Sequence, residues 1–167
     1  MHASLTVFLL LGANLGDREG MFRWVREQLS VRVGTVRKVS SLWETAAWGL
    51  TDQPSFLNQV LMVETDLTPA DLLAQTQALE TEGGRLRREK WGARVLDIDI
   101  LYIGSEVLDL PELKVPHPYI PERRFTLVPL AEIAPDFLHP VLQLTQQQLL
   151  NQCPDESKVE KYLADSQ

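Results

Sequence analysis

The pattern of hydrophobic and polar positions predicts three strands in the first 65 residues. Residues 5–11 form an apolar run, which predicts a buried first strand, and a second strand region is expected near residues 33–46. Residues 56–65, FLNQVLMVET, alternate clearly. This alternation places Phe56, Asn58, Val60 and Met62 on one face of a strand and Leu57, Leu61 and Val63 on the other. The pattern predicts an antiparallel sheet.

Two helices are predicted between these strands. The first would be capped by Asp17, and it carries Phe22, Val25 and Leu29 at helical spacing. The second covers TPADLLAQTQALETEGG, where Thr68 is the N-cap, Pro69 takes the first helical position and Asp71 completes a capping box. We expect this helix to stop at Gly83 and Gly84.

The last predicted strand lies within residues 93–104, ARVLDIDILYIG. The order is then strand, helix, strand, strand, helix, strand, which is the split unit of a ferredoxin-like α+β fold, with helices packed on an antiparallel sheet. Residues 105–140 are rich in proline and predict an ordered loop region with short turns of helix. The polar residues 154–167 read as a mobile tail.

Composition narrows the class of protein. With 167 residues, 44% of them hydrophobic, the chain suits a single domain over residues 1–167. A net charge of −7 argues against nucleic acid as a partner. The single cysteine, Cys153, fits a reducing compartment, and the N-terminal apolar run is too short for a membrane anchor and has no basic flank. We therefore expect a cytoplasmic protein with no nucleic-acid or membrane partner. We also expect a monomer.

Two carboxylates interrupt the last strand. Asp97 and Asp99 have one residue between them, so they lie on the same face of the strand, where they could grip Mg²⁺. A solvated polar face is the commoner reading of two aspartates at this spacing. However, this strand is apolar on both faces, with Leu96, Ile98, Ile100, Leu101, Tyr102 and Ile103, which predicts an interior strand whose charges need a partner.

A basic cluster precedes these carboxylates. Arg85, Arg87, Arg88, Lys90 and Arg94 lie within ten residues of an acidic protein. By itself such a run is often a solvated loop. Beside a metal site it suits polyphosphate, because the metal bridges phosphate oxygens and arginines bind the others. The chain has no G-x-x-x-x-G-K-[ST] sequence, so any nucleoside triphosphate is held without a P-loop.

Six motifs follow one another along the chain: LGANLGD, ETAAWG, DQPSFLNQV, ALETEGGRLRREKWG, KWGARVLDIDIL and VPHPYIPERRF. In this order they resemble the 6-hydroxymethyl-7,8-dihydropterin pyrophosphokinase family. The resemblance implies a ferredoxin-like fold and transfer of the β,γ-diphosphate of ATP to the hydroxymethyl group of the pterin, with release of AMP. It also implies two Mg²⁺ ions, with ATP as the co-substrate.

The resemblance also assigns residues to roles. Asp97 and Asp99 match the metal ligands and, with Arg85 and Arg94, the catalytic set. The implied ATP-binding residues are Gln77, Glu80, Arg87, Trp91, Arg94, His117, Tyr119 and Arg123. Gln77 and Glu80 also lie on one helix face. The implied pterin-binding residues are Thr45, Ala46, Trp48, Phe56, Asn58 and Phe125, of which Asn58 shares a strand face with Phe56.

Several points stay open at this stage. Ala46 and Ala47 stand where the family usually has proline, and Lys90 stands where arginine is frequent, which loses bidentate geometry. Two other functions stay open. A nucleotidyltransferase could also use an aspartate pair on such a fold, but it would release pyrophosphate. A non-catalytic ferredoxin-like module could bind a small molecule as a regulator, although it would not need the arginines and aspartates together. We also expect residues 83–94 to form a lid over the bound substrates.

Overall fold

The computed structural model describes residues 4–14, 16–45, 55–86 and 96–163. In chain order the elements are β1 (Leu5–Ala13), α1 (Arg18–Arg32), β2 (Gly34–Val39), β3 (Trp43–Thr45), β4 (Phe56–Thr65), α2 (Pro69–Leu86), β5 (Asp97–Ile103), β6 (Leu108–Asp109), β7 (Lys114–Val115), the 3₁₀ helix η1 (Ile120–Glu122), α3 (Arg124–Ile133), α4 (Gln146–Asn151) and β8 (Val159–Lys161). None of the helices in this described part is long and apolar enough to cross a membrane.

The main sheet confirms the predicted α+β fold. Its strands follow the order β5-β1-β4-β3-β8, and β2 also pairs with β4, further along that strand than β3. All of these pairings are antiparallel. The predicted second strand is split in two, because the chain leaves β4 after Val39 and returns to it at Trp43.

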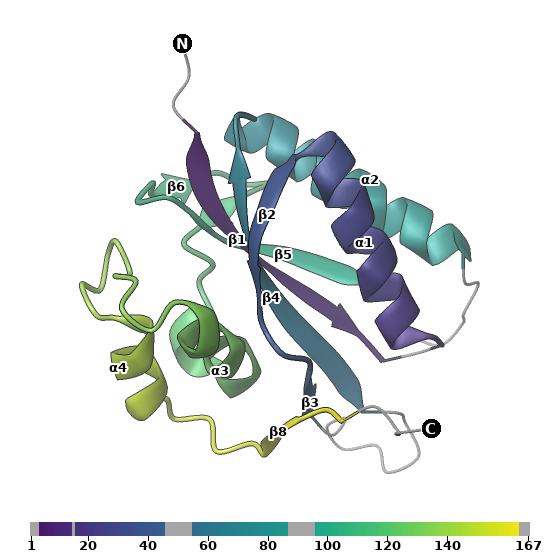
Figure 1. Cartoon of the computed structure of the whole chain (residues 1–167). Helices are drawn as coiled ribbons and strands as arrows, with labels where there is room; N and C mark the ends of the chain where they lie inside the picture. Colours follow the sequence, from purple (N-terminus) through teal and green to yellow (C-terminus); the bar gives the residue numbers. More distant parts are fainter. Residues whose placement is uncertain (1–3, 15, 46–54, 87–95, 164–167) are drawn as a thin grey trace.

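Each face of the sheet carries its own hydrophobic core. Figure 1 shows α1 and α2 on one face and α3 and α4 on the other. Leu57, Leu61 and Val63 of β4 belong to the core beneath α1 and α2, whereas Val60 belongs to the core beneath α3 and α4. The alternation predicted for this strand is therefore confirmed, and both faces of the central strands are buried.

The helix starts agree with the predictions, but the end of α2 does not. Asp17 Oδ1 accepts from the Gly20 N–H at 3.0 Å, and Thr68 Oγ1 accepts from the Asp71 N–H at 3.1 Å. The expected stop at Gly83 and Gly84 is wrong, since α2 continues to Leu86. A Cβ on Gly83 would lie 2.7 Å from Leu96 Cδ2, so this glycine permits close packing of the helix beside β5. The first part of the expected lid is thus helix.

The proline-rich region is more regular than expected. It contains the hairpin β6–β7 and the ten-residue helix α3, in which Pro129 is accommodated while Leu127 and Leu130 are fully buried. Further on, Val159–Lys161 of the segment read as a tail form β8, which pairs with β3. Sheet pairing therefore orders residues that composition alone marks as polar and mobile.

Candidate functional site

Two cavities lie next to each other around β5. The first, which we call the strand cavity, has a volume of about 200 Å³ and is lined by Leu10, Gly12, Thr45, Phe56, Asn58, Asp97, Asp99, Arg123 and Phe125. The second, which we call the helix cavity, has a volume of about 330 Å³ and lies between α2, β5 and residues 111–118. Asp99 lines both cavities.

The floor of the strand cavity is formed by neighbouring strands. Gly12 of β1 is opposite Asn58 of β4 on one side and Asp97 of β5 on the other. A Cβ on Gly12 would lie 3.0 Å from Asn58 Nδ2, so the absence of a side chain keeps the space between the amide and the carboxylate open. Asn58 is 5% exposed, and its Nδ2 donates to the Leu11 carbonyl at 3.1 Å, which fixes the amide against the floor.

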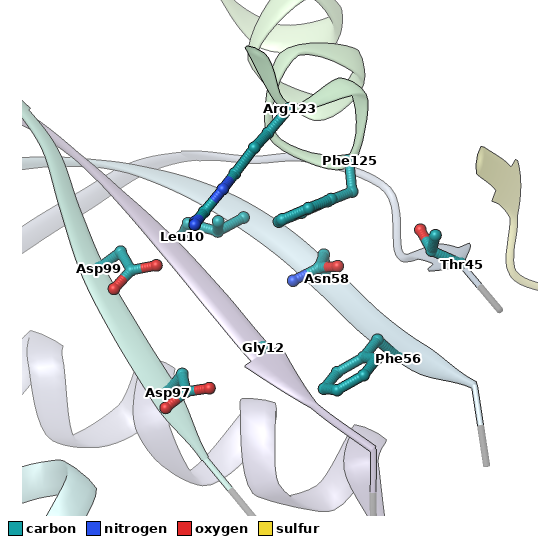
Figure 2. Close-up of a pocket in the computed structure, with 9 residues that line it drawn as sticks. All are labelled: Leu10, Gly12, Thr45, Phe56, Asn58, Asp97, Asp99, Arg123 and Phe125. Carbon is teal, nitrogen blue, oxygen red and sulfur yellow. The ribbon is translucent and has the colours of Figure 1, made fainter. Parts of the chain in front are cut away.

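Aromatic and cationic side chains form the walls of the strand cavity. Figure 2 shows Phe56, from the start of β4, and Phe125, from α3, on either side of Asn58. The guanidinium carbon of Arg123 lies 5.6 Å from the centre of the Phe125 ring and 4.6 Å from that of Tyr119. Such stacking holds the cation at the rim of the cavity. The arrangement suits a flat aromatic ligand between two phenyl rings.

Thr45 adds an unpaired hydroxyl to this cavity. It is 7% exposed, and its buried Oγ1 has no hydrogen-bond partner in the described part of the chain. A buried hydroxyl without a partner costs free energy. A ligand with a polar edge would recover that cost, so Thr45 indicates polar recognition at one side of the ring.

The two aspartates meet the predicted geometry. Asp97 and Asp99 are partly exposed residues of β5, and both carboxylates project toward the strand cavity in Figure 2. Mg²⁺ is commonly held by one or two carboxylates together with substrate phosphates. Within the described ranges no group of three or more His, Cys, Asp or Glu side chains is placed to hold a metal ion. The pair therefore fits a cation that is bound jointly with a phosphorylated substrate.

The helix cavity places Gln77 and Glu80 of α2 opposite residues near His117. Both predicted residues line it. Glu80 Oε2 also accepts from the Ile98 N–H at 2.9 Å, so this carboxylate fastens β5, and the aspartates on it, to α2. Lys114, which sequence analysis did not single out, contributes a cation to the same cavity and pairs with Asp109.

His117 and its neighbours connect the two cavities. Burial lowers the pKa of His117, the nearby Arg123 lowers it further, and the negative charge of Asp99 opposes both effects. His117 Nδ1 accepts from the Tyr119 N–H at 3.2 Å, so the neutral ring carries its proton on Nε2. Arg123, which the resemblance assigns to ATP, lines the strand cavity. Its effect on the pKa of His117 shows that it also lies near the helix cavity.

Several predicted site residues cannot be placed. Ala46, Trp48, Arg87, Trp91 and Arg94 lie outside the described residues, as do Ala47 and Lys90. Arg85 lies on α2, where its side chain is not described. Sequence reasoning missed Leu10 and Gly12 as well as Lys114. For Gly12 the available signal was its place in LGANLGD, and for Lys114 its closeness to the VPHP sequence.

Sequence comparisons agree with this geometry. The family model of 7,8-dihydro-6-hydroxymethylpterin-pyrophosphokinase matches residues 8–135. A protein of Aquifex aeolicus named 2-amino-4-hydroxy-6-hydroxymethyldihydropteridine pyrophosphokinase is 43% identical over 136 residues, which cover 81% of this chain and 84% of that protein. A Bacillus subtilis protein with the same name is 45% identical over 127 residues, covering 75% of this chain and 76% of that protein.

A structural comparison agrees on the fold. The wild-type HPPK-DHPS protein of Plasmodium falciparum superposes with a TM-score of 0.73 at 15% sequence identity, covering 90% of this chain. This chain spans only 45% of that longer solved chain. The family model and both sequence relatives match most of this chain. The chain therefore belongs to the 7,8-dihydro-6-hydroxymethylpterin-pyrophosphokinase family.

Proposed function

We propose that this chain is an ATP-dependent diphosphokinase of folate biosynthesis. It transfers the β,γ-diphosphate of ATP to the hydroxymethyl group of 6-hydroxymethyl-7,8-dihydropterin and releases AMP. The proposal rests above all on Asp99, which lines both cavities and so stands between a site for a flat ring and a site for a charged chain. Family membership supports the same reaction.

The strand cavity is the proposed pterin site. Phe56 and Phe125 are placed to stack on the two faces of the ring, and Asn58 and Thr45 are placed to pair with its polar edge. Asn58 donates one hydrogen to Leu11, which leaves its second amide hydrogen and Oδ1 for the ligand. Because the cavity combines two stacking rings with polar groups on its floor, it should bind a pterin in preference to a purely apolar ring. We include Ala46 and Trp48 in this site from the resemblance alone.

The helix cavity is the proposed nucleotide site. Gln77, Glu80 and His117 line it, and Lys114 supplies positive charge. From the resemblance we assign Arg85, Arg87, Arg94 and Arg123 to the phosphates of ATP. Tyr119 also belongs to the ATP site, and Trp91 helps to close it. Guanidinium groups bind phosphate oxygens bidentately, so they can hold the chain of phosphates in line with the pterin hydroxyl.

Asp97 and Asp99 would hold the Mg²⁺ that accompanies ATP, and we propose two ions. When bound, these ions neutralise the charge that develops on the transferred diphosphate. The residues of the chain position the reactants: the phenyl rings fix the hydroxymethyl group, and the basic residues fix the β-phosphorus. The hydroxymethyl oxygen forms a bond to the β-phosphorus. The bond from the β-phosphorus to the oxygen that bridges it to the α-phosphate breaks, AMP leaves with that oxygen, and the hydroxyl proton passes to solvent. Catalysis of this kind depends on alignment and charge neutralisation.

Product analysis tests the proposal. The purified chain is incubated with Mg²⁺ and ATP, with and without 6-hydroxymethyl-7,8-dihydropterin, and the nucleotides are separated by chromatography. We expect AMP in amounts equal to the pterin diphosphate formed, and little AMP without the pterin. Release of pyrophosphate would instead indicate a nucleotidyltransferase, and binding of both ligands without turnover would indicate a regulatory module.

We further propose that residues 1–167 form a single pyrophosphokinase domain, which works as a cytoplasmic monomer without nucleic acid or membrane partners. The continuous sheet from β5 to β8, which includes strands from both ends of the described chain, supports one folding unit. The negative net charge of −7 supports the exclusion of nucleic acid. Size-exclusion chromatography with light scattering would test the monomer, since a dimer would elute at twice the 18.9 kDa chain mass.

A further inference from the structure

Residues 46–54 connect β3 to β4 and lie outside the described residues, but both of their flanking residues are described. Thr45 ends β3, Ser55 directly precedes β4, and Thr45 pairs with Phe56 across the two strands. Thr45 and Phe56 both line the strand cavity. Any shift of β3 against β4 at this point would therefore move two walls of that cavity.

Three side chains, which we call the loop-base cluster, join the two flanks. They are Arg18 at the start of α1, Glu44 of β3 and Ser55. Arg18 Nη1 donates to the Ser55 carbonyl at 2.8 Å and lies 3.4 Å from Glu44 Oε2. Ser55 Oγ donates to the same Glu44 oxygen at 2.5 Å. One guanidinium thus ties both flanks of residues 46–54 to the first turn of α1.

The loop-base cluster is better protected than an ordinary surface ion pair. The Arg18 side chain is 18% exposed, whereas that of Arg37, which pairs with Glu64 between β2 and β4, is 52% exposed. Exposed pairs contribute little to stability because solvent screens them, and charged hydrogen bonds at partly buried sites contribute more. Arg18 is therefore placed to hold Glu44 and Ser55 at a fixed separation.

The C-terminal segment covers this cluster from the outside. In β8, Val159 is opposite Thr45 and Glu160 is opposite Glu44. The Tyr162 N–H donates to the Leu42 carbonyl at 2.8 Å, and the guanidinium carbon of Arg18 lies 5.3 Å from the centre of the Tyr162 ring. Figure 1 shows β8, in yellow, beside β3 at one end of the sheet. This segment lies beyond the region matched by the family model, which ends at residue 135.

We propose that Arg18 and the C-terminal segment 159–162 are positioning elements for the pterin. Arg18 fixes the separation of β3 from the start of β4, and Tyr162 keeps the guanidinium in place by packing on it. This inference rests on the proposed pterin site in the strand cavity. Neither element lines either cavity, so each acts through Thr45 and Phe56.

The sheet order makes the proposed effect selective. β5, which carries the aspartates and borders the helix cavity, lies at one edge of the sheet, while β3 and β8 lie toward the other. Disturbing β3 should therefore weaken pterin binding and leave nucleotide binding nearly unchanged. A residue with a general role in stability would weaken both together.

The test compares four variants of the full chain: Arg18→Ala and Tyr162→Ala, with Arg37→Ala and Leu163→Ala as matched controls. Arg37→Ala removes a similar arginine–glutamate pair elsewhere on the sheet, and Leu163 is 79% exposed beside Tyr162. Calorimetry gives the Kd for 6-hydroxymethyl-7,8-dihydropterin and, separately, for a non-hydrolysable ATP analogue with Mg²⁺. Steady-state kinetics gives the KM for each substrate and kcat.

We expect Arg18→Ala to raise the Kd and KM for pterin about tenfold and Tyr162→Ala to raise them about threefold, effects in the range of a lost charged contact and a lost ring contact. The ATP-analogue Kd and kcat at saturating pterin should stay within about twofold. Both controls should match the wild type. Tyr162→Phe, which keeps the ring, should restore pterin binding.

Three results would overturn the proposal: an unchanged pterin Kd in both test variants, an equal loss for both ligands, or the same loss in the controls. Tyr162→Ala decides the question if Arg18→Ala does not fold, because Tyr162 lies at the edge of the sheet. If the proposed function itself were wrong, the wild-type chain would not bind the pterin, and this result is distinct from the three above.

Discussion

The strand cavity and the helix cavity share Asp99 but are built in different ways. The strand cavity has a floor of paired strands and walls of aromatic side chains, and it measures about 200 Å³. The helix cavity measures about 330 Å³ and is bordered by α2, an edge strand and the hairpin region. Its predicted arginines mostly lie beyond the described residues. A rigid ring needs fixed walls, whereas a triphosphate needs charges that can adapt to it.

Because the two cavities are built differently, only a few residues can serve both of them. In the strand cavity, the floor is set by the backbone pairing of β1 with β4 and β5. In the helix cavity, Glu80 joins α2 to the strand of the aspartates by accepting a hydrogen bond from the Ile98 N–H. Asp97 and Asp99 connect the ring site to the phosphate site, and they should be the most sensitive positions.

The largest expected effect is therefore the loss of these carboxylates. Asp97→Ala or Asp99→Ala should reduce kcat by roughly a thousandfold or more, because the charge of the transferred diphosphate would no longer be neutralised through bound cations. Pterin binding measured without nucleotide should persist. The control is Asp136→Ala, an exposed aspartate after α3. Turnover near the wild-type rate at saturating Mg²⁺ in either folded variant would contradict the shared role of the pair.

A smaller effect is expected when the amide side chain that lines the strand cavity is removed. Asn58→Ala should weaken pterin binding by roughly 1–3 kcal/mol, since it removes a buried partner of the polar edge, and should leave ATP-analogue binding unchanged. Gln59 is the matched control: it is also 5% exposed but points to the opposite face, where it bonds Ser40 and Arg26. Gln59→Ala should lower stability without affecting pterin. Calorimetry of both variants with each ligand distinguishes these outcomes.

Acid should affect the helix cavity rather than the strand cavity. Of the described residues that line the two cavities, the only histidine is His117, in the helix cavity. Its pKa is lowered, chiefly by burial, so below pH 6.5 the unfolded chain binds protons more readily than the folded chain. The free energy of unfolding should thus fall as pH drops through this window, by at most about 1.4 kcal/mol per pH unit, and by less for a partly exposed ring.

Urea denaturation at several pH values measures this dependence. His117→Asn should flatten the curve between about pH 5 and 6.5. Burial also lowers the pKa of His139, which lies outside both cavities, so His139→Asn isolates the second contribution. If the His117→Asn curve keeps the full wild-type slope, the acid sensitivity does not come from the helix cavity.

The sequence was sufficient for the elements whose periodicity is local. The alternation of β4 predicted which residues face each core, and Asp17 and Thr68 predicted both helix starts. The spacing of Asp97 and Asp99 predicted a shared face, and the alternation of β4 predicted a shared face for Phe56 and Asn58; all four residues line the strand cavity. These features depend on residues close in sequence, for which strand and helix geometry is decisive.

Features that depend on distant residues were not predictable in the same way. β8 is polar and short, and it is ordered by pairing with β3, more than a hundred residues earlier in the sequence. α3 contains Pro129, yet burial of Leu127 and Leu130 outweighs the helix-breaking preference. Arg123 and Phe125 likewise reach the strand cavity because α3 packs against the sheet, and no local sequence pattern specifies that packing.

The smallest expected effect concerns the two glycines at which α2 was predicted to stop. In a helix, alanine is more favourable than glycine by up to about 1 kcal/mol, and nothing lies within 4 Å of a Cβ placed on Gly84. Gly84→Ala should therefore raise the free energy of unfolding by that amount. A Cβ on Gly83 would instead lie 2.7 Å from Leu96 Cδ2 and 3.3 Å from Met21 Sδ, so crowding should cancel or reverse the gain. Because Leu96 directly precedes Asp97, Gly83→Ala should also lower kcat slightly, while Gly84→Ala should not. Denaturation and turnover measured on both variants would contradict this packing if Gly83→Ala proved as stabilising as its neighbour.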